Sequence, residues 1–266
     1  MRTAVLSCFS LLLSLGVLAQ EVREPDIVGG KREWKYLVET QLQYPYASIQ
    51  AGEQGTVSID CYISSTGQLE EIEFIKSVSP AVDREALRIL KHVVWRPGVY
   101  EGSEIQGVTR MKIDFYPDRY YRYCRNRGYR LLPHPVTPVS EETTLYTKEE
   151  VDSVAKPLIP EGWEAFPYIL SKLKYPEDAV RESIQGEVRL RYVVEQSGHI
   201  TNVEIVQNLG GGCPQEVTRV LRALDWIPAI RNGMAVRSTQ EISILFQLGV
   251  GGTAKEFVYG AQQGIY

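Results

Sequence analysis

Hydrophobic and polar residues alternate along two seven-residue stretches of the chain, and this period of two predicts β-strands. The apolar positions are Val57, Ile59, Cys61 and Ile63 in the first stretch and Val188, Leu190, Tyr192 and Val194 in the second. A turn with a glycine, which tolerates a positive φ, and a returning strand over residues 69–76 or 200–207 come after each stretch. The pattern therefore predicts two β-hairpins, each of which needs a helix on its apolar face to be stable.

A helical period comes after each hairpin and predicts that covering helix. Apolar residues recur at the i, i+4, i+7, i+8, i+11 spacing of a buried stripe: Val82, Ala86, Ile89, Leu90 and Val93, then Cys213, Val217, Val220, Leu221 and Leu224. Each helix ends in a Trp-x-Pro sequence. Earlier helices are expected over residues 31–43 and 162–174, where they end at a Tyr-Pro pair. The last strands are expected over residues 108–116 and 239–248.

The two sets of elements are copies of one unit, because the chain matches itself without a gap after a shift of 131 residues. The matched residues include rare types: Tyr44 and Tyr175, Gly55 and Gly186, Gly67 and Gly198, Trp95 and Trp226, Pro97 and Pro228, Phe115 and Phe246. A chance register would not keep glycine, proline and tryptophan aligned over seventy residues. The repeat predicts two tandem domains, over residues 29–116 and 148–248.

The order of elements indicates an α+β fold with a three-stranded antiparallel sheet packed by helices in each domain. A right-handed crossover through the helix places the third strand beside the first, in the order 2-1-3. The third strand is then a free edge that another chain can extend. The residues predicted to bind a partner lie on these edges: Glu241, Ile242, Ser243, Ile244, Leu245 and Phe246, and Met111, Ile113 and Phe115.

Residues 1–19 have the features of a cleavable secretory signal peptide. Arg2 supplies a positive charge, an apolar run covers residues 4–18, and Ala19 precedes the expected cleavage before Gln20. The run is shorter than the roughly 20 apolar residues of a membrane span. We therefore expect cleavage, with retention of the segment as a membrane anchor as the alternative.

Three cysteines remain after this cleavage, so they cannot all pair within one chain. Cys61 and Cys213 fall on the predicted core faces, which favours buried and unreactive thiols. Cys124 falls in the predicted linker, where we expect it to be reactive or to pair between chains.

Composition and motifs argue against an enzyme. The chain has 266 residues, is 44% hydrophobic and carries a formal net charge of -4, which calls for neither a nucleic acid nor an anionic membrane as partner. His92, His134 and His199 lack the spacing of metal ligands, so no metal site is expected. Residues 153–156 and 171–174 match S-x-x-K, but the companion motifs of an acyl transferase are missing, so we interpret both as helix surface. No G-x-S-x-G, H-E-x-x-H or G-x-x-x-x-G-K motif is present, and no cofactor is predicted.

The segment between the domains, residues 117–147, has an unusual composition. Five arginines alternate with four tyrosines over residues 118–130, and Pro133, Pro135 and Pro138 stiffen the rest of the segment. We interpret it as a linker that packs the domains together or is solvated; contact with anionic glycans or lipid headgroups is the alternative. The Gly-rich residues 249–266 are expected to be a disordered tail.

These landmarks together resemble the C-terminal domain of TonB from bacterial envelopes. The shared pattern is Tyr-Pro, a Gly-x-Val strand, a Ser-x-Gly turn, a helix closing in Trp-x-Pro, then Asn-Gly and a strand ending in phenylalanine. The second copy fits it better, with Gly210, Trp226 and Asn232-Gly233 in place, whereas Pro80 and Glu101 depart from it in the first copy. The resemblance covers roughly residues 29–116 and 148–248.

This resemblance implies a periplasmic, non-enzymatic domain that pairs its last strand with a segment of an envelope partner, such as the N-terminal box of a TonB-dependent outer-membrane receptor. A TonB-type energy transducer anchored in the inner membrane is one alternative. However, no long spacer precedes the first copy, and an extended chain spans only about 3.3 Å per residue. A structural module that dimerises through the same edges is the other alternative.

Overall fold

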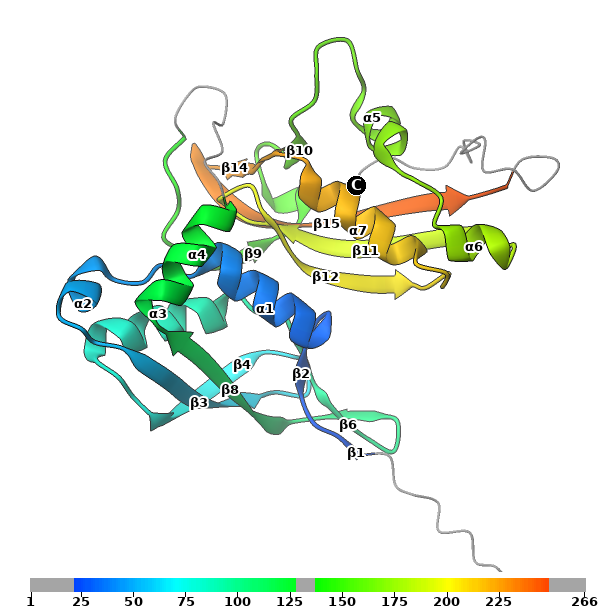
Figure 1. The fold of residues 1–266 in the computed structure, drawn as a ribbon. Coiled ribbons are helices and arrows are strands. Elements are labelled where there is room, and N and C mark those ends of the chain that lie inside the picture. The colour runs from blue at the N-terminus through cyan, green and yellow to red at the C-terminus, as the bar shows by residue number, and fades with distance from the viewer. Residues whose placement is uncertain (1–21, 128–136, 249–266) are drawn as a thin grey trace, which may run out of the picture.

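The computed structural model describes residues 22–127 and 137–248. The predicted signal peptide, the predicted tail and residues 128–136 of the linker lie outside the described residues. Figure 1 shows two α+β domains, one built by the first half of the chain and one by the second. The mixed α+β character and the duplication predicted from the sequence are therefore present in the structure.

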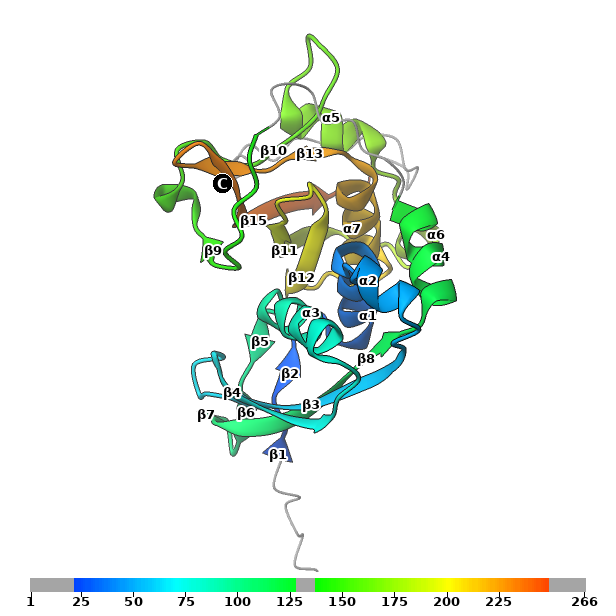
Figure 2. The ribbon, with the colours of Figure 1, turned by 90° about the vertical axis from the view of Figure 1, so that its left-hand side faces the viewer.

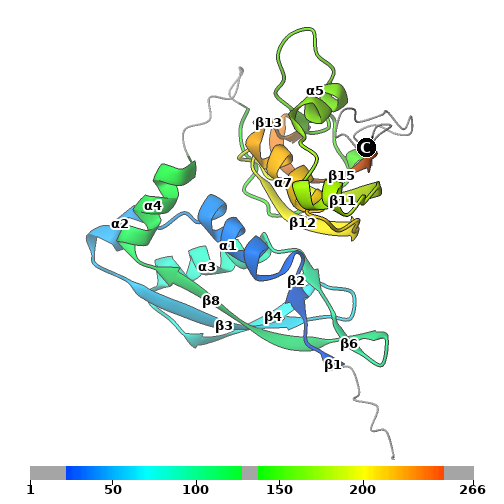
Figure 3. The ribbon, with the colours of Figure 1, turned by 45° about the vertical axis from the view of Figure 1, so that its right-hand side comes forward.

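The first domain is a three-stranded antiparallel sheet with helices on one face (Figures 1 and 3). Its strands are ordered β4-β3-β8. They comprise β3 (Gly55–Ile63), β4 (Leu69–Lys76) and β8 (Gly107–Phe115). The covering helices are α1 (Gly30–Gln41) and α3 (Pro80–Lys91).

The second domain repeats this arrangement and extends it. Strands β11 (Gly186–Val194), β12 (Ile200–Gln207) and β15 (Met234–Phe246) lie in the order β12-β11-β15. Helices α5 (Ala165–Lys172) and α7 (Cys213–Ala223) pack with them. Strand β15 begins at Met234, five residues before the predicted start, because the chain enters it directly from a hairpin.

Short elements complete both domains. In the first they are β1 (Val22–Arg23), β2 (Asp26–Ile27), α2 (Tyr46–Gln50), β5 (Trp95–Arg96), β6 (Gly98–Tyr100) and β7 (Ser103–Ile105). In the second they are β9 (Leu145–Tyr146), the 3-10 helix η1 (Lys148–Glu150), β10 (Lys156–Pro157), α6 (Glu177–Arg181), β13 (Trp226–Ile227) and β14 (Ala229–Arg231). The segment at residues 22–27 pairs with β5 and β6, so the first domain begins earlier than the predicted residue 29.

Local sequence explains where the main helices and turns form. The Ser79 side chain caps α3 by accepting a hydrogen bond from the Val82 N–H at 3.4 Å, and Pro80 occupies the first turn, where its missing N–H costs nothing. The turn after β3 requires glycine at residue 67. Its φ is 77°, and a Cβ there would meet the Trp95 carbonyl oxygen at 2.8 Å.

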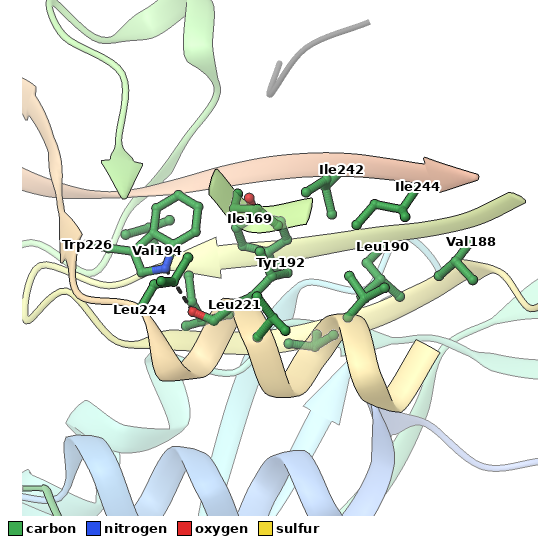
Figure 4. Close-up of a cluster of buried hydrophobic side chains, with 14 of the residues drawn as sticks. Ile169, Val188, Leu190, Tyr192, Val194, Leu221, Leu224, Trp226, Ile242 and Ile244 are labelled. Atoms are coloured by element: carbon green, nitrogen blue, oxygen red, sulfur yellow. Dashed lines mark hydrogen bonds between the residues drawn. The ribbon is translucent and has the colours of Figure 1, made fainter. Parts of the chain in front are cut away.

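Each domain has its own apolar core, as the alternating pattern predicts. In the second domain Val188, Leu190 and Tyr192 project from β11 toward α7 (Figure 4). Trp226 is fully buried there and donates its Nε1–H to the Leu221 carbonyl at 2.9 Å, which ties the end of α7 to β13. Cys213 is buried in this core, and Cys61 is buried in the core of the first domain.

The arginine- and tyrosine-rich segment is not a free linker, because Pro117–Arg127 forms helix α4. Arg127 donates from Nε to the Glu39 carbonyl at the end of α1. Tyr120 packs edge-on against Tyr44, with ring centroids 5.7 Å apart. Helix α4 therefore packs within the first domain, whereas the sequence alone predicts a segment that packs the two domains together or is solvated. Cys124 is exposed on it.

Candidate functional site: the sheet edges and the domain interface

The last strand of the first domain forms an edge of its sheet. Strand β8 pairs with β3 along its whole length, from Gly107 opposite Ile63 to Phe115 opposite Gly55. Within residues 22–127 and 137–248, no strand pairs with the other side of β8. An edge of this kind offers unpaired N–H and C=O groups to another strand.

The last strand of the second domain is open over only part of its length. Strand β15 pairs with β11 from Ser238 to Phe246. On its other side, β9 from the predicted linker pairs in parallel, with Leu145 opposite Arg237 and Tyr146 opposite Ser238. The expectation of a three-stranded sheet with a wholly free third strand is therefore wrong for this domain, since the chain itself covers the start of that strand.

The predicted partner-binding residues divide between the core and the surface. Among them Ile113, Phe115, Ile242, Ile244 and Phe246 are buried in the two cores. Met111 is half-buried, whereas Leu245 is 39% exposed. A guest strand would therefore meet mainly the backbone of these residues, and the core side chains would serve to hold each edge strand in place.

The polar residues of the second edge make ion pairs and hydrogen bonds across the sheet. Glu241 accepts a hydrogen bond from Arg191 Nε at 2.9 Å, and Ser243 donates its hydroxyl to Glu187. These bonds run toward β11. Beyond Ser238, no described strand pairs with the backbone on the other side of β15.

The direction of the backbone groups can be deduced from the linker contact. The Ala235 N–H donates to the Pro138 carbonyl at 2.8 Å, and the Ala235 carbonyl accepts from the Ser140 N–H at 3.0 Å. Every second residue of a strand points its backbone groups the same way. Ser243 therefore points them to the open side of β15, as does Lys112, its counterpart in the first repeat, for β8.

A buried group of charged residues joins the two domains, and no pattern in the sequence predicted it. Arg237 donates from Nε to Glu195 at 2.7 Å and from Nη2 to the His92 carbonyl of the first domain at 2.8 Å. His92 Nδ1 lies 3.0 Å from the same carboxylate. Arg237 and Glu195 are 2% and 1% exposed. Because a buried charge without a partner is costly, these residues fix the domains together.

The hydrogen bonds identify the form of His92. Its Nδ1 faces the Glu195 carboxylate and so carries the proton, while its Nε2 lies 3.1 Å from Arg88 Nη1 and accepts from it. Burial, together with the nearby charges of Arg237 and Arg88, lowers the pKa of His92 although the Glu195 carboxylate raises it. Burial alone would raise the pKa of Glu195, but Arg237 and His92 outweigh it and hold that pKa at about 2. The cluster thus contains a neutral histidine between two charged partners.

This arrangement predicts that the protein loses stability in mild acid. The unfolded chain takes up a proton at His92 near its ordinary pKa of about 6.5, whereas the folded chain resists protonation. The free energy of unfolding should therefore fall as the pH drops from about 7.5 to about 5.5, as measured by urea denaturation. His92→Gln should flatten this dependence; an unchanged pH profile in the variant would contradict the assignment.

Two further contacts join the first domain to β12, beside which α1 lies (Figures 2 and 3). Glu33 on α1 accepts from the Val203 N–H at 3.0 Å and from Arg222 Nη2 at 2.7 Å. Asn202, which has a φ of 50°, donates to the His92 carbonyl at 3.0 Å and accepts from the Val94 N–H at 2.9 Å. The side chain of Asn202 thus makes the hydrogen bonds that a neighbouring strand would make with the backbone at His92 and Val94. Through these bonds the first domain covers the edge of β12.

Neither a reactive core thiol nor a metal centre is found in the described part of the chain. Burial raises the pKa of the Cys61 thiol to about 12, so this cysteine is unreactive at neutral pH. Over the described ranges, no three His, Cys, Asp or Glu side chains gather as a metal site would require. No helix of that part has the length and apolar character needed to cross a membrane.

Comparison with known proteins agrees with the duplicated fold. A family model of the Gram-negative bacterial TonB protein C-terminal matches twice, at residues 40–117 and 171–248. A solution NMR structure of the Pseudomonas aeruginosa TonB CTD is similar at 19% identity and a TM-score of 0.28, over 39% of this chain and 94% of that chain. The search of curated proteins finds no match. Since the family model covers more than half of the chain, the protein belongs to the TonB C-terminal domain family, with two copies of that domain in tandem.

Proposed function

We propose that this protein is a non-enzymatic adaptor of the periplasm that binds an extended segment of an envelope partner by adding it to a sheet edge. The partner is an outer-membrane receptor of TonB-dependent transport, through its N-terminal box, or another envelope protein. The observation that carries the proposal is the open side of the last strands, along β8 and along β15 beyond Ser238, in a protein of the TonB family.

The structure of the edges suits strand addition rather than side-chain chemistry. Most of their apolar side chains are buried in the cores, and the backbone groups of alternate residues face outward. Main-chain hydrogen bonds give affinity in this mode, and the side chains that flank the edge give selectivity. The predicted signal peptide would deliver the chain to the periplasm, where such receptors expose their N-terminal segments.

Photo-crosslinking in Gram-negative cells tests this proposal. A photoreactive residue at Lys112 or Glu241, on the open side of either edge, should capture a receptor's N-terminal segment, identified by mass spectrometry. The double variant Lys112→Pro, Ser243→Pro removes one outward N–H from each edge without removing a bond of the sheet, and should abolish capture. The double alanine variant keeps both N–H groups and should capture normally. Equal capture by the proline and alanine variants would refute strand addition.

A further inference from the structure

The start of the last strand has the same geometry in both domains. In the second, β14 pairs with β15 so that Ala229 lies opposite Val236. In the first, β6 pairs with β7 in the same register, with Gly98 opposite Ile105. Residues 103–107 of the first domain therefore correspond one to one with residues 234–238 of the second.

These equivalent positions differ sharply in exposure. In the second domain Ala235 and Arg237 are each 2% exposed, and Ser238 is 1% exposed. In the first domain the counterparts Glu104 and Gln106 are exposed, and Ile105 between them is 37% exposed. The same piece of backbone is thus buried in one copy and open to water in the other.

The linker covers the start of β15, and the first domain adds to the burial of Arg237 through the carbonyls of Lys91 and His92. Residues 138–146 of the linker run along the start of β15, where Val139 bridges to Ala235 and β9 pairs with the next residues in parallel. Tyr146 is 8% exposed and packs into the core of the second domain, and the Arg231 guanidinium lies 4.4 Å from its ring centroid. The linker thus acts as an added strand that the chain supplies to its own second domain.

No described segment takes this place on the first domain. Over residues 22–127 and 137–248, residues 103–107 pair only with β6 and β3. The open backbone is flanked by Ile105 and by Val108, which is 42% exposed. A long exposed edge beside apolar side chains favours association with another chain.

From this difference we propose that residues 103–107 accept an extended segment of another protein, in the place that the linker takes on β15. The guest runs parallel to β8 and carries an apolar residue followed by an aromatic one, as Leu145 and Tyr146 do. The second domain is already occupied by its own linker, so the two copies have different roles. This inference rests on the proposed function: the guest that adds to β8 begins beside residues 103–107 and continues past Lys112.

The backbone at Glu104 offers a selective test. Its counterpart Ala235 directs both its N–H and its carbonyl to the linker. Proline at residue 104 should therefore remove the hydrogen bond to the guest and leave the β6–β7 pairing intact. Glu104→Ala is the matched control, because it removes the charge and keeps the N–H.

The probe is a synthetic peptide with the sequence of residues 138–147, labelled for fluorescence anisotropy and carrying a benzophenone in place of the Tyr146 ring. Added to the full-length mature protein, it should bind and form crosslinks to residues 104–108. Glu104→Pro should weaken binding about tenfold, the usual effect of losing one hydrogen bond at a covered edge, and Glu104→Ala should not.

Each other outcome has a distinct meaning. Crosslinks at residues 239–246, or equal binding by the proline and alanine variants, would overturn this inference and leave strand addition itself intact. Crosslinks at residues 234–238 would show that the peptide displaces the linker, which overturns the division of roles. Absence of peptide binding would also overturn the inference about residues 103–107. The proposed function is tested separately, and it fails only if capture in cells is insensitive to prolines at Lys112 and Ser243.

Discussion

Arg237→Met should lower the free energy of unfolding by about 3–5 kcal/mol, the usual cost of removing one partner from a buried ion pair. The Glu195 carboxylate, 1% exposed, would then keep only two uncharged polar neighbours, His92 and the hydroxyl of Thr201. The variant also loses the bonds from Arg237 to the carbonyls of His92 and Thr143. Urea denaturation followed by circular dichroism measures the effect.

The same experiment reports on how the domains are coupled. Because Arg237 links both domains, we expect the variant to unfold in two separate transitions, whereas the parent protein unfolds in one. Arg191→Met is the matched control. Arg191 pairs with Glu204 and Glu241 at the surface, its side chain is 50% exposed, and its loss should cost at most about 1 kcal/mol.

A double variant distinguishes two causes of the lost stability: a buried charge without a partner and the loss of packing. In the double variant Glu195→Met, Arg237→Met no charge is left buried without a partner, so stability should recover in part relative to Arg237→Met alone. If Arg237→Met and Arg191→Met were equally stable, the buried cluster would not hold the domains together.

Trp226→Ala should also lower the free energy of unfolding by about 3–5 kcal/mol, because it opens a cavity in the core of the second domain. Trp226 is fully buried, packs edge-on against Tyr192 with ring centroids 5.7 Å apart, and bonds through Nε1 to Leu221. Its removal takes away both packing and the hydrogen bond that ends α7.

The repeat provides an internal comparison for this variant. Trp95 occupies the equivalent place in the first domain and is 7% exposed, but its Nε1 has no hydrogen-bond partner among the described residues. Trp95→Ala should therefore cost less than Trp226→Ala, by about one hydrogen bond, or roughly 1 kcal/mol. Trp163, 49% exposed, should be replaceable by alanine at little cost. Equal unfolding midpoints for Trp226→Ala and Trp163→Ala would contradict the core assignment.

The sequence was a good guide wherever structure depends on neighbouring residues. Alternation at Val57, Ile59 and Cys61 placed β3, and the helical spacing of Val82, Ala86 and Ile89 placed α3. Both patterns report which side of an element meets the core, and this requirement acts on each element separately. The 131-residue repeat then predicted the equivalent strand and helix of the second domain.

The sequence was a poor guide to contacts between distant segments. Strand β9 has only two residues, Leu145 and Tyr146, and so shows no period that could reveal it. Arg237 lies in β15 and Glu195 directly follows β11, and nothing in the local pattern marks either charged residue as buried. A buried charge is stable only with its partner in place. Glu195 contacts His92, which lies 103 residues away in the chain, so no local pattern reveals the contact.

The amino-acid sequence by itself determined the duplicated α+β domain, its elements and its core faces, because hydrophobic periodicity is a property of each short segment. Only the tertiary structure decided how the copies differ. The docking of the first domain on the second buried the charged cluster of Arg237, Glu195 and His92. The pairing of the linker covered one sheet edge and left its counterpart open. These contacts join residues far apart in the chain, and their stability comes from the geometry of both surfaces together.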